Sequence, residues 1–145
     1  IVFEHLDKTG KVRGSKKQKL KMWRSQEVQS IVTNKAHRLK MHISHICAWG
    51  ISRLAFDGSG RVLRGKESER TAGNYSLCEF QTGKIYNCDL SASYNIGARY
   101  FIRELLKSLP EKARLRVEAK VPQCSKRSTC TFSTLINLNA VLASV

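Results

Sequence analysis

Two carboxylates in this sequence stand at positions where an acid is costly unless it has a partner. Glu4 interrupts the apolar, strand-like run of residues 1–6, and Asp89 stands where an apolar stretch passes into a helical pattern. A buried carboxylate needs a cation, a hydrogen-bond donor or a metal ion. Asp89 alone has a simpler interpretation as a helix N-cap, because its charge suits the helix dipole. Two acids at strand ends in a basic chain indicate a metal site that acts on phosphodiesters.

The charge balance of the chain predicts a polyanionic partner. Among 145 residues there are 26 lysines and arginines against 11 acidic residues, for a formal net charge of +15. Such a surface gives salt-sensitive affinity for phosphate groups. A hydrophobic content of 41% argues against wholesale disorder and predicts one domain with its own core. No apolar run has the length of a membrane span, and no N-terminal signal is visible, so we expect no membrane partner.

The five cysteines and the first residue set the expected context. An odd number of cysteines at irregular spacing argues against a secreted disulfide framework and favours a reducing cytosol or nucleoid. The chain opens with Ile1 inside a strand pattern, without a methionine, cap or turn. We therefore expect a fragment from which part of the sheet is missing.

Hydrophobic periodicity predicts the elements that must position the two acids. Trp23 and other apolar residues at helical spacing predict one long helix, and Phe101 is expected on the apolar side of another that ends at Pro110. The glycine-rich residues 57–74 predict a flexible basic loop or a small insert. The expected elements are a strand at 1–6, a helix at 17–40, a strand at 41–48, a hairpin of 75–77 and 84–88, helices at 90–109 and 111–120, a basic loop at 124–130 and a terminal helix or strand at 135–145.

The order of these motifs resembles the RuvC nuclease domain of the TnpB family. Ile-Val-Phe-Glu-His-Leu around Glu4 resembles the family's second acidic motif. Residues 87–96, Asn-Cys-Asp-Leu-Ser-Ala-Ser-Tyr-Asn-Ile, resemble the third. TnpB proteins are transposon-encoded, RNA-guided DNA endonucleases that are similar to type V CRISPR effectors. The resemblance implies an α/β, RNase H-like mixed sheet with flanking helices, incomplete at the N-terminus; residues after Pro110 match nothing in the family.

The resemblance also implies a catalytic site. Glu4 and Asp89 would be its catalytic residues and would each bind Mg²⁺, with Mn²⁺ as a substitute, in a two-metal site. The family's third ligand is an aspartate on a strand that would precede Ile1. Asp7 and Asp57 lie in turns and do not replace it. The remainder of the nuclease, in the same protein or in a separate chain, is therefore an expected partner.

A departure from the family pattern concerns its four-cysteine zinc ribbon. Ala55 and Gly58 stand where the first cysteine pair would be, and Gln81 replaces the partner of Cys78. Structural zinc needs four ligands, so we expect a degenerate, zinc-ribbon-like insert without zinc, in which Cys78 is a remnant. The alternative is a site rebuilt from Cys47, Cys78 and the two cysteines of the tail.

The resemblance divides the chain into segments with different expected roles. These are a RuvC-like part at 1–50, the degenerate insert at 51–86, a second RuvC-like part at 87–110 and a tail of unknown role at 111–145. Basic residues near the site are expected either to contact nucleic acid or to form a solvated face. They are Lys16, Lys17, Lys19, Arg61, Arg64, Lys66 and Arg70.

The function that these observations predict is that of the C-terminal part of an RNA-guided DNA endonuclease in the prokaryotic cytosol or nucleoid. Its hydrolysis of phosphodiesters would depend on Mg²⁺, and its partners would be a guide RNA and a target DNA. Two alternatives stay open. One is a nuclease-dead, RNA-guided DNA-binding repressor, and the other is a non-catalytic RNA-binding scaffold protein.

Overall fold

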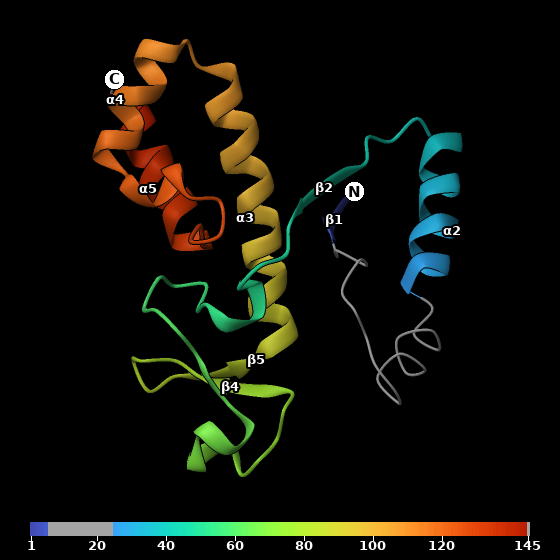
Figure 1. Cartoon of the computed structure of the whole chain (residues 1–145), viewed down its shortest axis with the longest axis vertical. Coiled ribbons are helices and arrows are strands. Elements are labelled where there is room, and N and C mark those ends of the chain that lie inside the picture. The colour runs from blue at the N-terminus through green and yellow to red at the C-terminus, as the bar shows by residue number, and fades with distance from the viewer. Residues whose placement is uncertain (6–24, 145) are drawn as a thin grey trace, which may run out of the picture. The chain divides into compact units, whose positions relative to one another are not determined.

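The computed structural model describes residues 1–5 and 25–144. Within these ranges the chain is mixed α/β, with helices and two small β-sheets (Figure 1). It divides into two units, Ile1–Ile46 and Cys47–Val145. The mixed α/β class predicted from the sequence is confirmed.

The first unit contains a two-stranded sheet. Strand β1 (Val2–His5) pairs with β2 (Ser44–Cys47). The backbone N–H of Ser44 donates to the carbonyl of Ile1 over 3.0 Å, and the N-terminal amino group donates to the carbonyl of His42 over 2.7 Å. The start of the chain is thereby tied to the segment that enters β2.

Helix α2 (Ser25–Arg38) belongs to the same unit. Its first turn carries Glu27 and its last turn is basic, an arrangement that suits the helix dipole. Ala36 is buried. The helix ends where Lys40 adopts a left-handed φ of 55° and the N–H of Met41 donates back to the carbonyl of Ala36 over 2.9 Å.

The second unit begins with the predicted insert, which is folded. A three-stranded antiparallel sheet in the order β3-β4-β5 forms its base, with Cys78 opposite Tyr86 in register. Short 3-10 turns occupy the glycine-rich stretch, so this stretch is a small insert and not a flexible loop. The elements are η1 (Ile51–Arg53), β3 (Leu63–Arg64), η2 (Gly65–Glu67), η3 (Glu69–Thr71), β4 (Leu77–Glu79) and β5 (Ile85–Asn87).

Three helices complete the second unit, and α3 passes from the insert to the C-terminal segment (Figure 1). Pro110, the N-cap of α4, separates it from α3, and a capping box of Thr131 with Thr134 begins α5. The elements are α3 (Cys88–Ser108), α4 (Glu111–Lys120), η4 (Pro122–Ser125) and α5 (Phe132–Ala143). The terminal segment, expected as a helix or a strand, is a helix.

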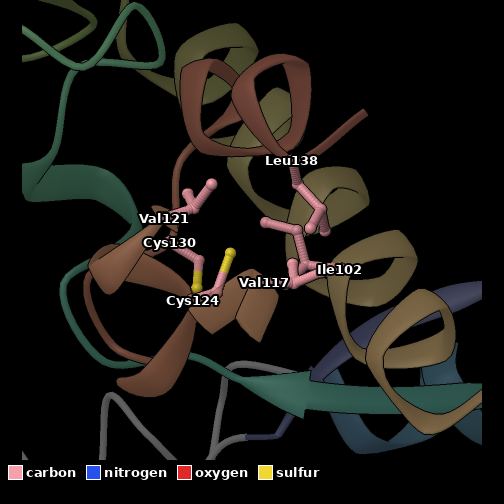
Figure 2. Close-up of a cluster of buried hydrophobic side chains, with 6 residues drawn as sticks. All are labelled: Ile102, Val117, Val121, Cys124, Cys130 and Leu138. Carbon is pink, nitrogen blue, oxygen red and sulfur yellow. The ribbon is translucent and has the colours of Figure 1, made fainter. Parts of the chain in front are cut away.

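The core of the C-terminal segment lies between these helices. Figure 2 shows its buried side chains, which come from α3, α4, α5 and the loop between the last two. They are Ile102, Val117, Val121, Cys124, Cys130 and Leu138. The tail beyond Pro110 is thus built into the same folded unit as the insert and Asp89.

The predicted order of elements is confirmed within the described residues, with shifted boundaries. The strands expected at 1–6, 41–48 and 84–88 are shorter than predicted, and the strand expected at 75–77 lies two residues later, as β4. The expected helix at 90–109 begins two residues earlier, at Cys88. The helix expected at 17–40 is described from Ser25 onward. Its earlier part, which includes Trp23, lies outside the described residues.

Candidate functional site

The junction between β5 and α3 presents Asp89 at the start of a long helix. Asn87 is the N-cap: its Oδ1 accepts hydrogen bonds from the backbone N–H groups of Asp89 at 3.0 Å and Leu90 at 2.9 Å. The interpretation of Asp89 as the cap is therefore wrong. Its carboxylate is exposed in the first turn and has no hydrogen bond or ion pair with the described part of the chain. The Asp89 side chain is thus accessible to a cation.

Glu4 lies at the third position of β1 and is half-buried. The rings of its two neighbours, Phe3 and His5, lie 5.9 and 6.3 Å from the ring of His45. Because side chains alternate along a strand, Phe3 and His5 share one face of the small sheet and Glu4 lies on the other. The acid is thus separated from the aromatic contacts of its own strand.

The two acids belong to different units. Glu4 is part of Ile1–Ile46 and Asp89 is part of Cys47–Val145. Over residues 1–5 and 25–144, no group of three or more His, Cys, Asp or Glu side chains is arranged to hold a metal ion. Each acid nevertheless offers the hard carboxylate oxygens that Mg²⁺ prefers, so the two residues fit that ion by donor type.

A buried arginine holds the helix that carries Asp89. Arg99 is 5% exposed, and its guanidinium donates to four backbone carbonyls. These belong to Cys47 at 2.7 Å, Trp49 at 2.8 Å, Ser128 at 2.6 Å and Cys130 at 3.1 Å. Burial lowers the pKa of Arg99, and the four carbonyl dipoles compensate its charge. Two segments far apart in the sequence are thereby bound to one position on α3.

Asn95 makes a second connection one turn earlier on α3. Its side chain is fully buried, and Nδ2 donates to the carbonyls of Leu54 at 2.8 Å and Ile51 at 3.3 Å. Its Oδ1 accepts from the backbone N–H of Phe132 at 3.2 Å. The side chain therefore joins the beginning of the insert and the beginning of α5 to the helix.

Sequence reasoning missed the role of these two polar residues. It expected Phe101 on the apolar side of this helix, whereas Phe101 is 55% exposed. The buried face instead follows Ser91, Asn95, Ala98 and Ile102. These positions recur at i, i+4, i+7 and i+11, so the helical period was present in the sequence, although polar residues carried half of it.

The first tip of the insert, where the resemblance would place a first cysteine pair, is closed by packing. Ala55 is fully buried, and Gly58 has a φ of 83°. A Cβ at Gly58 would lie 3.0 Å from the hydroxyl oxygen of Ser133. The N–H of Ser133 donates to the carbonyl of Phe56 over 2.9 Å, so the start of α5 lies against this tip. A cysteine ligand does not fit at Gly58.

The second tip of the insert is closed by a hydrogen bond and a buried thiol. Nε2 of Gln81 donates to the carbonyl of Arg61 over 2.7 Å and so joins the two tips by a hydrogen bond. Cys78 is buried, and its Sγ lies 3.5 Å from the carbonyl oxygen of Tyr86. Burial, with a further contribution from Cys88, raises the pKa of the Cys78 thiol to about 12. Zinc binds the thiolate, so the residues present do not fit a structural zinc ion.

Aromatic rings cluster around Phe56 beside the buried core of the insert. The ring of Phe56 lies 5.5 Å from Phe80, 5.1 Å from Tyr86, 5.1 Å from Tyr94 and 6.5 Å from Phe132. These rings come from both tips of the insert, from α3 and from α5. Edge-to-face and tilted arrangements at such distances stabilise a core beyond the area that they bury.

The alternative zinc site is not formed within the described chain. All five cysteines are free, and they lie in different surroundings. Cys78 and Cys88 belong to the core of the insert, whereas Cys124 and Cys130 belong to the core between the helices. Cys47 is exposed.

Two arginines that were expected to contact phosphate are ion-paired inside the insert. Arg61 contacts Glu67 at 2.9 Å, and Arg70 contacts Glu79 at 2.8 Å. Arg53 also contacts Glu67, at 2.7 Å. These pairs fix the turns η2 and η3 on the sheet, and they reduce the positive charge that this segment offers to a partner.

The other predicted phosphate contacts have different positions. Arg64 donates to the carbonyls of Tyr75 at 3.1 Å and Ser52 at 3.5 Å. Lys66 is exposed and has no ion pair with the described residues. The remaining predicted contacts lie outside the described residues; they are Lys16, Lys17 and Lys19.

No protein-family model, curated protein or solved structure matches the chain. The site is therefore interpreted from its own residues. Among the helices of the described ranges, none has the length and apolar character needed to cross a bilayer.

Proposed function

We propose that the chain is the C-terminal part of an RNA-guided DNA endonuclease with a RuvC-like, RNase H-like site. The position of Asp89 carries this proposal. Asn87 caps the helix, so the exposed carboxylate of Asp89 serves no capping role and has no partner among the described residues. Glu4, which lies on β1, is proposed as a second carboxylate ligand. The net charge of +15 suits a guide RNA and a target DNA.

The chemistry assigned to the site is hydrolysis of a DNA phosphodiester. Bound Mg²⁺ supplies the activated water and the stabilisation of the leaving oxygen. Glu4 and Asp89 hold the metal ions, and the third acidic ligand comes from the remainder of the nuclease. Asn95 and Arg99 act as positioning residues, because their hydrogen bonds keep α3 from shifting along the segments that pack on it.

Substitution of Asp89 in the complete nuclease tests the proposal. With guide RNA, Mg²⁺ and a labelled target, Asp89→Asn is expected to abolish cleavage while guide and target binding persist. Glu4→Gln is expected to do the same. Asp57→Asn is the matched control, since Asp57 is an exposed turn residue whose Oδ1 accepts from the N–H of Ser59 at 2.9 Å, a bond that asparagine keeps.

Three other results would each favour a different conclusion. Cleavage by Asp89→Asn at the parent rate would overturn the nuclease proposal. Guide-dependent DNA binding without cleavage, even by the parent, would favour the repressor. RNA binding without any guide-dependent recognition of DNA would favour the scaffold.

A further inference from the structure

Helix α4 carries a row of cations that have no partner in the described chain. Lys112, Arg116 and Lys120 recur every four residues and are exposed. None of the three forms an ion pair or a side-chain hydrogen bond with residues 1–5 or 25–144. Four residues of helix rise by about 6 Å, so the three charges follow one flank of α4 over roughly 12 Å.

The acidic residues of α4 lie on the other side of the helix. At about 100° per residue, Glu111 and Glu118 are roughly 140° and 160° from Arg116 around the axis. Glu118 contacts Arg114 at 4.0 Å. Val117 packs into the core between the helices, so α4 is oriented by its apolar side. The helix therefore separates a purely basic flank from a flank where the charges compensate one another.

The loop after η4 adds two more cations at fixed positions. Lys126 and Arg127 are exposed and have no ion pair within the described ranges. The loop is anchored at both ends by Cys124 and Cys130, whose side chains lie in the core (Figure 2). The hydroxyl of Thr129 donates to the carbonyl of Lys126 over 2.8 Å. The two cations are therefore presented by a structured turn.

Several basic residues of the insert, in contrast, form ion pairs with acidic residues. Glu67 offsets one of the two positive charges of Arg53 and Arg61, and Glu79 offsets that of Arg70. On α4 and the loop after η4, by contrast, five cations have no ion pair in the described chain, and the sequence had assigned this segment no role. A ligand with regularly spaced negative charges is complementary to this arrangement.

We propose that this basic C-terminal surface binds the phosphodiester backbone of nucleic acid. The name covers the row on one flank of α4, Lys112, Arg116 and Lys120, together with Lys126 and Arg127 on the loop after η4. Backbone contacts of this kind position a nucleic acid without reading its sequence. A membrane is the less suitable occupant, because a helix that lies in a bilayer interface needs its apolar face free, and α4 buries Val117 in the core. The inference rests on the proposed function for its choice of nucleic acid as the partner. It does not depend on catalysis, because binding requires none.

Binding of the full chain to two labelled probes tests this surface. The probes are a short duplex DNA and a single-stranded RNA of equal length, titrated over a range of salt concentrations. Lys112→Gln, Arg116→Gln and Lys120→Gln together are expected to lower affinity at least about tenfold near 0.1 M salt and to reduce the salt slope by about 2 to 3. A larger loss for one probe identifies which nucleic acid the surface holds.

Two single substitutions on the same helix form a matched pair. Arg116→Gln is expected to weaken binding and to reduce the salt slope by about 1, whereas Arg114→Gln, whose arginine contacts Glu118, is expected to bind almost as the parent does. Lys112→Arg with Lys120→Arg keeps the charge and should keep the affinity. Far-UV circular dichroism confirms that each variant is folded.

The outcomes separate this inference from the proposed function. Parent affinity of the triple variant for both probes would overturn the inference. Loss of binding to vesicles that contain anionic phospholipid, without loss for either nucleic acid, would overturn it in favour of a membrane. Asp89→Asn should bind both probes as the parent does. If the surface binds nucleic acid but the complete protein never cleaves DNA, the surface stands and the nuclease proposal fails.

Discussion

Asn95 and Arg99 lie one turn apart on the buried side of α3, and every hydrogen bond that their side chains donate ends on a backbone carbonyl. Within the described residues, no carboxylate forms an ion pair with the guanidinium of Arg99. The two side chains join the helix to segments that are far away in the sequence. The position of Asp89 at the start of α3 therefore depends on contacts made in the middle of the helix.

Substitution of Arg99 is expected to be strongly destabilising. Arg99→Met fills a similar volume but leaves four carbonyl groups without their donor, at a cost of at least about 3 kcal/mol in the free energy of unfolding. Urea denaturation followed by far-UV circular dichroism measures the change. The control is Arg103→Met on the same helix, whose arginine contacts Glu104 near the surface and should cost less than about 1 kcal/mol. Equal losses in the two variants would contradict the role given to Arg99.

Removal of zinc is expected to leave the insert folded. Ala55, Gly58 and Gln81 provide no thiolate, and aromatic side chains fill the interior instead. Incubation with a strong chelator should therefore leave the melting temperature of the purified chain unchanged. A fall in the melting temperature that added Zn²⁺ reverses would show that a metal site exists after all.

The aromatic interior should account for much of the stability of the insert. Phe80 is 1% exposed, and its ring contacts Phe56 and Tyr86. Phe80→Ala is expected to lower the free energy of unfolding by about 3 to 5 kcal/mol, because it opens a cavity in this core. Phe101→Ala removes a ring that is 55% exposed and should cost less than about 1 kcal/mol. Similar losses of unfolding free energy in the two variants would contradict a stabilising role for the Phe80 ring.

Acid is expected to weaken the insert through two carboxylates. A hydrogen bond from the N–H of Arg64, with help from Arg53, lowers the pKa of Glu67 below 4.5. A hydrogen bond from the hydroxyl of Ser68, with help from Arg70, lowers the pKa of Glu79 below the same value. A carboxyl whose folded pKa is lowered stabilises the fold above its unfolded pKa. That contribution is lost as the pH falls below 4.5 and through the folded pKa values.

Unfolding curves recorded over a series of acidic pH values test this expectation. The double variant Glu67→Gln with Glu79→Gln should be less stable than the parent at neutral pH and should lose less stability on acidification. Glu69→Gln is the control, since Glu69 is exposed and forms no ion pair in the described chain. A double variant that follows the parent curve would contradict the assignment of these two acids.

Thiol reactivity should distinguish one cysteine from the other four. Cys47 is exposed, whereas the others are buried. Burial raises the pKa of Cys78 to about 12 and that of Cys124 to about 11, and it also raises the pKa of Cys130. An aromatic disulfide reagent at about pH 8 is therefore expected to label one thiol rapidly in the native chain. Cys47→Ser should remove this fast phase; two or more fast thiols in the parent would contradict the burial.

The order of elements could be predicted from the sequence because hydrophobic periodicity is a local signal. The cap of α3 could not be assigned in the same way. Asn87 and Asp89 are both residue types that favour the N-cap position, and they are two positions apart. Asn87 is the cap because α3 begins at Cys88, the residue that follows it. Asn95 and Arg99 were missed on the buried face of α3 because they are polar, and their carbonyl partners come from distant segments.

The insert shows the same limit. The sequence shows that Ala55 and Gln81 offer no thiolate at their positions. The packing that closes the insert could not be predicted from the sequence, because Phe132 and Ser133 contact the insert from α5. Contacts between residues so far apart in the sequence produce no periodic pattern in it.

The closure of the insert by rings, with Phe56 at their centre, changes how this part of the chain responds to cooling. A ribbon that is closed by a metal ion unfolds when protons neutralise its thiolates or when a competing ligand takes the metal. Burial of apolar surface instead carries a large heat-capacity change, and its contribution weakens as the temperature falls. The contribution of this packing to the stability of the insert should therefore decrease on cooling. The stability of the insert should not depend on the zinc concentration in the cell.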